Sequence, residues 1–491
     1  MHFPIQKLEF PTFAFLIFFL VVAGTYWALP RHRWRMTWLL FASCIFYMSF
    51  HPWLILLIVA SASVDYIVAL RLEHVTGLAK RRLLLACSIG VNLGLLGFFK
   101  YTNFLLGNAN SLFCLFGVDY HWPLLENLYL PLGMSFYTFE AISYVVDVYQ
   151  GRLKAVRSLL DYALYIMFFP HLAAGPIVRP RDFLPQLHRT KRFHEYRAVV
   201  GLLIFLVGLF KKAVIADHMA PIVDPIFADP GAWSSSAAWL GTLAYAVQIY
   251  CDFSGYSDMA MGLAHVLGFK LPVNFAMPYF ALNITDFWRR WHISLSSWLR
   301  DYLYIPLGGS RGGAWVTYRN LMTTMLLGGL WHGASWTFVF WGGYHGLLLA
   351  LHRAFASWRG ERSADSGDQQ PLALRFALRV PRAALSISVT FLCVCIGWVF
   401  FRAQSFGGAA TVLARLAWPT HGRHLDLPSS VLVGVCVALV FAGHLVGSAT
   451  DVRAVWRRWP APALGSALAA LLLLVLLFFP ETRAGFIYFN F

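Results

Sequence analysis

Two short motifs place a histidine beside a tryptophan in an otherwise apolar chain. One is Trp291-His292-Ile293-Ser294, and the other runs from Gly328 through Trp331 and His332 to Trp336. Imidazole gains and loses a proton near neutral pH, so it can act as a general base. An ionisable residue within a bilayer is costly and therefore indicates a functional site. The alternative is that each histidine only hydrogen-bonds a neighbouring helix, but two such motifs joined by a basic stretch favour a site.

The composition indicates that a membrane surrounds these motifs. Of the 491 residues, 59% are hydrophobic and 13% are charged, whereas a soluble domain carries about 25% charged residues. We expect one all-α polytopic body over residues 1–491, with core motifs in 131–352 and a cytoplasmic linker at 357–372. The net charge of +16 is expected to face anionic lipid headgroups, because no nucleic-acid-binding motif accompanies it.

Apolar stretches recur along the chain and define the expected membrane helices. They lie near 11–29, 37–50, 53–70, 83–106, 131–149, 198–216, 237–251, 321–335, 336–352, 383–401, 430–449 and 463–479. Segments 158–176 and 252–275 contain polar residues with proline or glycine, so we expect them to be broken, as re-entrant or tilted pieces. Residues 321–352 are expected to form a hairpin.

Lysine and arginine concentrate in a few connections. The clusters fall within 31–35, 80–82, 152–157, 179–197, 289–319, 353–382 and 453–458, and neither residue occurs between Tyr101 and Gln150. Cytoplasmic loops of membrane proteins are enriched in these residues. The pattern therefore predicts that the clusters lie in the cytoplasm, that 107–128 lies outside, and that both termini lie outside.

The segment 283–312 predicts an amphipathic helix at headgroup level, with tryptophan and arginine along it. Such a helix could present Arg289 and Arg290 to an anionic donor and turn His292 inward. The glycine-rich run 308–313 lacks the lysine and hydroxyl ending of a phosphate loop, so it predicts a turn.

The run from Asp252 through Ser254 to Asp258 places two carboxylates and several hydroxyls between apolar segments. Such groups need partners or water inside a membrane. Two interpretations are open. The run could be a structural hydrogen-bond network around a broken helix, or it could be one wall of a polar tunnel near the site.

A third polar feature is the run 169–177, in which two prolines and a glycine surround His171. It predicts a non-helical membrane loop that lines a cavity or packs on protein. His171 is expected to be structural, with a substrate contact as the alternative. Glu140 and Asp147 lie earlier in the chain, on an apolar helix, and we expect them to be paired structurally.

Metal and disulfide chemistry are not expected. His345 and His352 raise a metal interpretation together with His292 and His332, but no HExxH or HxxHH pattern is present. The seven cysteines lie mostly in apolar segments and form no CxxC pair, which favours packing roles.

The chain resembles the membrane-bound O-acyltransferase family, and within it the bacterial alginate O-acetyltransferase branch. The resemblance rests on motifs that occur in order over nearly the whole chain, at 131–139, 169–177, 252–258, 286–294, 302–309, 329–333 and 486–491. On this resemblance His332 matches the family's central histidine, and His292 matches its second catalytic position.

The resemblance implies a ring of tilted transmembrane helices with re-entrant segments around a central tunnel, in the bacterial inner membrane with periplasmic termini. It implies acetyl transfer from a cytoplasmic thioester, either acetyl-CoA or an acetylated carrier protein, with no bound cofactor. The acceptor would be a periplasmic exopolysaccharide, with alginate expected, reached directly or through an SGNH-type partner. Candidate substrate- or donor-binding residues are Trp291, Arg289, Arg290, Trp331, Ser294, Asp252 and Ser254.

Chemistry agrees with this assignment, because a thioester is already activated. The enzyme must position a hydroxyl, accept its proton and stabilise the developing oxyanion. His332 is the expected base, and His292 would polarise the acyl carbonyl or orient His332. The alternatives are a secondary transporter, since broken helices and membrane carboxylates also mark transporters, or a scaffold for polysaccharide export.

Overall fold

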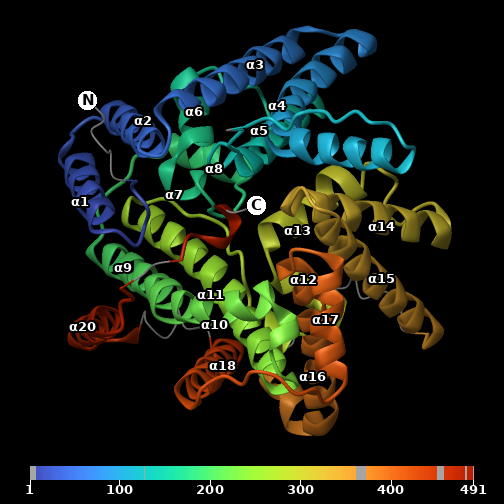
Figure 1. Ribbon diagram of the computed structural model, residues 1–491. Coiled ribbons are helices and arrows are strands. Elements are labelled where there is room, and N and C mark those ends of the chain that lie inside the picture. Colours follow the sequence, from blue (N-terminus) through green and yellow to red (C-terminus); the bar gives the residue numbers. More distant parts are fainter. Residues whose placement is uncertain (1–6, 127, 361–371, 451–457, 482–483, 490–491) are drawn as a thin grey trace. The chain divides into compact units, whose positions relative to one another are not determined.

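The computed structural model describes residues 7–126, 128–360, 372–450, 458–481 and 484–489, and every regular element in these ranges is a helix (Figure 1). This confirms the predicted all-α class. Among the described residues, the helices long and apolar enough to cross a membrane are Pro52–His74, Leu78–Leu115, Glu195–Ala228, Pro381–Arg402 and Leu427–Ala449. Shorter apolar helices are Phe13–Ala28, Phe406–Ala417 and Ala461–Leu477. The chain is a multi-pass membrane protein.

The chain divides into two compact units, and the boundary crosses helices α9 (Glu195–Leu209) and α11 (Ser235–Val266) and the connection after α11. The first unit comprises residues 1–205 and 259–272, and the second comprises 206–258 and 273–491. A single functional domain over 1–491 stays a prediction. The predicted linker at 357–372 lies largely outside the described residues.

The first unit contains the N-terminal helices. They are α1 (Phe13–Ala28), α2 (His32–Met48), α3 (Ile55–His74), α4 (Leu78–Leu115), α5 (Met134–Tyr149), α6 (Leu159–Met167), α7 (Phe169–Leu172) and α8 (Pro180–Leu187). The predicted break in 158–176 is confirmed, because α6 ends at Met167 and only the single turn of α7 follows. Buried His171 lies 3.2 Å from the Glu140 carboxylate, which also accepts the Val178 N–H. Both residues therefore have a structural pairing.

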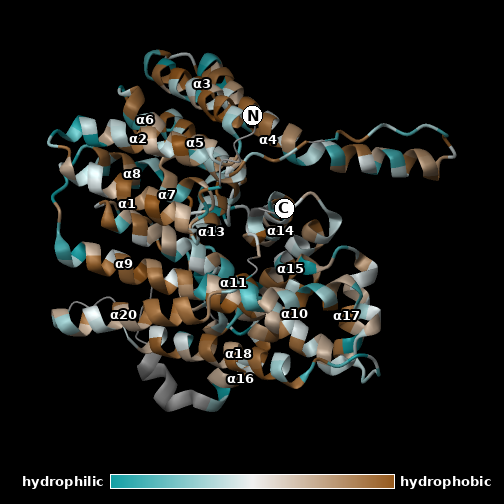
Figure 2. Ribbon diagram, turned by 60° about the vertical axis from the view of Figure 1, so that its left-hand side comes forward, coloured by the Kyte–Doolittle hydropathy of each residue, from teal (hydrophilic) through white to brown (hydrophobic). Residues whose placement is uncertain are grey.

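Helix α4 is much longer than its apolar segment predicted. It has 38 residues, which at 1.5 Å per residue is about 57 Å, against a hydrocarbon core of about 30 Å. Its C-terminal part projects with the following segment beside it (Figure 2). Asn110 and Asn103 exchange hydrogen bonds with the backbones of Trp122 and Leu125, which fasten that segment to the helix. The predicted outside loop 107–128 is thus partly helical.

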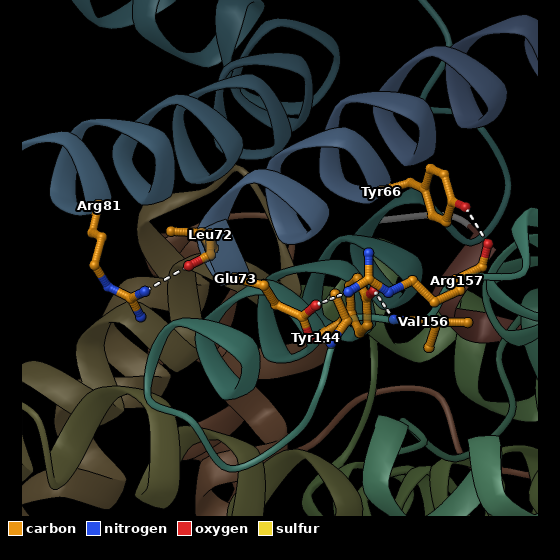
Figure 3. Close-up of polar contacts among 8 residues, drawn as sticks. Tyr66, Leu72, Glu73, Arg81, Tyr144, Val156 and Arg157 are labelled. Atoms are coloured by element: carbon orange, nitrogen blue, oxygen red, sulfur yellow. Dashed lines mark hydrogen bonds and ion pairs between the residues drawn. The ribbon is translucent and has the colours of Figure 1, made fainter. Parts of the chain in front are cut away.

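The basic connection between α5 and α6 is held against α3 (Figure 3). Arg157 forms a 2.7 Å ion pair with Glu73, and its carbonyl oxygen accepts the Tyr66 hydroxyl at 2.6 Å. The Val156 N–H donates to the Tyr144 hydroxyl at 3.0 Å. These bonds satisfy two backbone groups of a non-helical segment and hold Arg157 against α3.

The second unit carries both tryptophan–histidine motifs. Its elements are the π-helical turn η2 (Phe210–Ala216), α10 (Asp217–Ala228), most of α11, α12 (Ile284–Arg290), α13 (Ile293–Leu299), η5 (Arg300–Tyr304), α14 (Gly313–His332), α15 (Trp336–Trp358), α16 (Leu372–Arg402), α17 (Phe406–Ala417), α18 (Leu427–Ala449), α20 (Ala461–Leu477) and the 3-10 turn η6 (Ile487–Phe489). Helices α14 and α15 lie side by side, which confirms the predicted hairpin (Figure 1). A Cβ at Gly329 would collide with the Phe338 carbonyl oxygen of α15, so glycine permits this close packing.

The predicted break at 252–275 is wrong over its first half, because α11 continues through Gly255 to Val266. A Cβ on Gly255 would lie 2.6 Å from the Gly208 carbonyl oxygen, so this glycine serves close helix packing and not a break. The carboxylates of the run have lysine partners: Asp252 pairs with Lys212 at 2.6 Å, and Asp258 pairs with Lys211 at 2.6 Å. Satisfied in this way, the polar run stays helical.

Candidate active site

His292 lies at a sharp turn between α12 and α13. Its backbone is left-handed, with φ 45° and ψ 54°, a region that few non-glycine residues occupy and that recurs at functional sites. The predicted continuous helix over 283–312 is therefore wrong. The helix stops here because the first N–H of α13 donates to the Asn274 carbonyl oxygen at 2.9 Å instead of to the preceding turn. The glycine-rich run 308–313 is a turn leading into α14, as predicted.

Asn274 sets the orientation of the His292 ring. Its Oδ1 accepts the Ser294 backbone N–H at 3.2 Å and the Ser294 hydroxyl at 2.9 Å, and it lies 3.1 Å from His292 Nδ1. Because a backbone N–H is always a donor, the facing atom is the amide oxygen, and Nδ1 must carry the proton. Asn274 Nδ2 donates to the Ser257 hydroxyl at 3.2 Å. His292 Nε2 is therefore the ring nitrogen with the lone pair.

His292 is also held in an apolar setting. Its side chain is fully buried, and its ring packs edge-on against Phe253 with ring centroids 4.6 Å apart. Burial lowers the pKa of His292 to about 3, because the charged imidazolium loses its hydration. The ring is consequently neutral at physiological pH.

His332 occupies the last residue of α14, where the chain turns into α15. The side chain is 3% exposed and surrounded by aromatic rings. Ring centroids lie 4.9 Å away for Trp331, 5.1 Å for Trp341, 5.3 Å for Phe401 and 5.6 Å for Tyr488. This packing fixes the imidazole while the helix end places it beside a bend in the backbone.

The fold brings the two predicted histidines together. Their ring centroids are 6.4 Å apart and the ring planes meet at 60°. Trp331 contacts both, with centroid distances of 6.2 Å to His292 and 4.9 Å to His332. Two imidazoles at this spacing, buried and fixed in orientation, can bind one reacting group between them and move its proton.

Of the other predicted binding residues, two lie at the histidine pair and five have different surroundings. Ser294 and Trp331 lie at the histidine pair, as described above. Trp291 is buried in an aromatic core, with ring centroids 4.8 Å from Trp398 and 5.0 Å from Phe275. Arg290 forms a 2.8 Å ion pair with Asp286 of the same helix. The remaining three are exposed Arg289, buried Ser254, and Asp252 with its lysine partner.

Several residues of the site did not stand out in the sequence. Asn274 is one polar residue in an apolar loop, and only its position beside His292 reveals its importance. Lys212 lies within the apolar segment 198–216, and a lysine buried there requires a carboxylate partner. Tyr488 approaches His332 from the far C-terminal end of the chain, at a sequence distance that no local pattern indicates.

The two histidines that suggested a metal have other surroundings. The His345 ring packs against Trp341 and Trp288, at 5.0 and 5.2 Å. His352 Nδ1 lies 3.0 Å from the Thr285 hydroxyl. Within the described part of the chain, no three His, Cys, Asp or Glu side chains are grouped to hold a metal ion.

Comparison with known proteins gives this geometry a context. The sequence profile of the MBOAT, membrane-bound O-acyltransferase family, matches residues 148–396, which include both histidines and Asn274. The chain is 42% identical to the probable alginate O-acetylase AlgI of Azotobacter vinelandii over 451 residues, 90% of this chain and 85% of that protein. It is 40% identical to the peptidoglycan O-acetyltransferase of Helicobacter pylori over 402 residues, 77% of this chain and 72% of the relative. Identity to the teichoic acid D-alanyltransferase of Bacillus subtilis is 28% over 312 residues, 58% of this chain and 74% of the relative.

Proposed function

Because the chain belongs to the membrane-bound O-acyltransferase family, we propose that it carries an acetyl group from a cytoplasmic thioester to a periplasmic polysaccharide. The relatives named above as an alginate O-acetylase and a peptidoglycan O-acetyltransferase support O-acetylation. Alginate is the proposed acceptor, reached directly or through an SGNH-type partner, and acetyl-CoA or an acetylated carrier protein is the proposed donor. The observation that carries the proposal is the convergence of His292 and His332 at a ring distance of 6.4 Å.

His332 is the proposed general base. It accepts the proton of the acceptor hydroxyl as that oxygen attacks the thioester carbonyl. The carbon–sulfur bond then breaks, and the imidazolium returns the proton to the thiolate, so that an ester and a free thiol are formed. The chain's own residues thus need only position the reactants and hold one proton between the two steps.

His292 is proposed to orient the reacting groups by accepting a hydrogen bond. Its Nδ1 proton is committed to Asn274, and its Nε2 has the lone pair. A neutral ring of this tautomer has no free N–H with which to polarise a carbonyl. Of the two expectations from the sequence, the one in which His292 orients His332 is therefore favoured over carbonyl polarisation.

Trp341 is the proposed donor to the acyl oxygen as it gains charge. The ring stands edge-on to His332, with an interplanar angle of 89°. Its indole N–H is buried and makes no hydrogen bond within the residues that the structure describes. A fixed N–H donor in a water-poor site stabilises a developing oxyanion strongly.

The experiment that tests the function uses the purified protein in lipid vesicles with acetyl-CoA or acetylated carrier protein and alginate. Acetyl transfer releases one free thiol for each ester formed, and both products are measured. A transporter or an export scaffold would release no thiol when the acceptor is added. Peptidoglycan fragments serve as the competing acceptor and decide the substrate class.

Arg289 is predicted to bind the anionic part of the donor. It is exposed on α12, where a donor in solution can reach its guanidinium group. Arg289→Gln should raise the KM for the donor about tenfold, the effect of losing one charge-assisted hydrogen bond, with little change in kcat. Arg311→Gln, which also removes an exposed charge, here from the turn before α14, is the matched control. Equal effects of the two variants on KM would contradict a specific role for Arg289.

The predicted topology can be tested by cysteine labelling in spheroplasts. Asp119 and Ser357 are exposed, and the exposed native thiols Cys87 and Cys114 are first replaced by serine. A membrane-impermeant maleimide should label Asp119→Cys in intact spheroplasts and Ser357→Cys only after lysis, because basic clusters mark the cytoplasmic side. The reverse pattern would place Arg289 on the side without donor and contradict the proposed direction of transfer.

A further inference from the structure

Three charged side chains form a cluster inside the second unit. Lys212 lies in the π-helical turn η2, Asp217 begins α10, and Asp252 lies within α11. Their exposed fractions are 3%, 2% and 1%. The Lys212 Nζ lies 2.7 Å from Asp217 Oδ1 and 2.6 Å from Asp252 Oδ1. Charges buried at this depth are costly, so their retention calls for a specific role.

The cluster also binds the C-terminal segment 484–489. An ammonium group has three donors, and the third N–H of Lys212 donates to the Ala484 carbonyl oxygen at 3.0 Å. The second oxygen of Asp252, Oδ2, accepts the Ile487 backbone N–H at 2.8 Å. Lys212 and Asp252, which belong to different helices, thus each form one hydrogen bond to a segment more than 200 positions away in the sequence.

The anchored segment lies directly against the catalytic pair. Phe486 is buried against Tyr256, with ring centroids 4.7 Å apart. Tyr488 follows Ile487, whose N–H bonds Asp252. The centroid of the Tyr488 ring lies 4.4 Å from that of Phe253 and 5.6 Å from that of His332. Phe253 in turn packs against His292 at 4.6 Å. A shift of the segment would therefore loosen the packing around both imidazoles.

We propose that Lys212, Asp217 and Asp252 are positioning residues for acyl transfer, which fix the segment 484–489 as a wall of the histidine site. A cluster that only joined η2, α10 and α11 would satisfy its charges among the three side chains. Here Lys212 and Asp252 satisfy their charges in the cluster and each also forms a bond to the segment. The inference rests on the proposed function for its effect on rate, whereas the anchoring itself can be measured without activity.

Backbone amide exchange of the purified full-length protein tests the anchoring. In Lys212→Met the Ile487 amide should exchange about tenfold faster or more, because the anchoring charge is lost. Lys211→Met is the matched control, since Lys211 has an equally short pair with Asp258 and no bond to the segment in the described contacts. Unchanged Ile487 exchange in Lys212→Met would overturn the proposal.

Acetyl transfer supplies the second measurement. Ile487→Pro removes the N–H that bonds Asp252 but leaves the ion cluster intact, and Ile487→Ala keeps that N–H as its control. We expect Ile487→Pro to lower kcat about 10–100-fold, the cost of a small misplacement in an active site. Asp252→Asn should lower kcat less in the Ile487→Pro background than in the unmutated chain, because the bond to the Ile487 N–H is already absent there, whereas the ion pair with Lys212 is lost in both backgrounds. Additive losses would show that Asp252 acts only on the helices and would overturn the proposal.

These outcomes separate the two proposals. Loss of segment protection with normal acetyl transfer would overturn the positioning role and leave the function standing. A protected segment in an unmutated protein that transfers no acetyl group would overturn the proposed function and leave the anchoring intact. If Lys212→Met does not fold, the Ile487→Pro and Ile487→Ala pair decides the question.

Discussion

His332→Ala is expected to abolish acetyl transfer while the protein still inserts into the membrane and purifies normally. The imidazole is the proposed acceptor of the hydroxyl proton, and loss of a general base commonly costs about 10²–10⁴ in rate. The ring lies at the end of α14, enclosed by Trp331, Trp341 and Phe401, so its removal leaves a cavity among these aromatic side chains. Ester and thiol formation should both fall.

A matched variant separates chemistry from packing. His444→Ala also removes a buried histidine, which packs on Tyr250 and Tyr279 and whose Nδ1 bonds the Val440 carbonyl oxygen. It should retain most of the activity despite a similar loss of stability. Near-normal acetylation by His332→Ala, or an equal loss in both variants, would contradict the assignment of His332 as base.

His292→Ala is expected to have the second largest effect, a loss of about 100-fold in kcat. His292 is the second imidazole at the site, and its left-handed backbone and its bond to Asn274 preorganise the ring. His292→Gln can place an amide oxygen near the position of Nε2 and still accept a hydrogen bond, so it should recover part of the activity. Near-normal activity of both variants would show that His292 only shapes the turn between α12 and α13.

Because His292 must be neutral to accept a hydrogen bond, its role predicts a specific dependence of the rate on pH. Burial keeps its pKa at about 3, so the neutral form required for accepting a hydrogen bond persists at all pH values near neutrality. Asn274→Asp places a carboxylate beside Nδ1, and an opposite charge raises a histidine pKa by about 1–3 units. The neutral form is then lost as pH falls through the raised pKa. The acid limb of the pH–rate profile should therefore shift to higher pH.

Asn283→Asp is the control for that experiment. Asn283 caps α12 through its side-chain oxygen, and aspartate caps a helix equally well. This variant adds the same charge but is not bonded to His292 in the described contacts. A pH profile that shifts as much in Asn283→Asp as in Asn274→Asp would show a general effect of charge and contradict a specific role for the neutral ring.

Much of the architecture follows from the chain's composition and local pattern. Long apolar runs and few charges predict membrane helices because unpaired backbone groups are too costly in hydrocarbon. The hairpin at 321–352 and the break in 158–176 were predicted for the same reason and are confirmed. Both catalytic candidates could also be named from sequence, because a histidine in such a setting is costly unless it has a role.

Other features depended on partners that are distant in the sequence. The polar run at 252–258 predicted a break, but α11 continues because Lys211 and Lys212 satisfy its carboxylates. Residues 283–312 predicted one helix, but α12 ends at Arg290 and α13 begins at Ile293, because the Asn274 carbonyl oxygen accepts the Ile293 N–H.

By itself, the sequence determined that this is a helical membrane protein and which histidines could act. These conclusions depend on transfer energies and local spacing, which are properties of single segments. Only the tertiary structure decided that His292 and His332 meet, that Asn274 fixes the tautomer of His292, and that Tyr488 lies against His332. Those contacts join segments with no shared periodicity, so they are determined by packing and hydrogen-bond satisfaction across the folded chain.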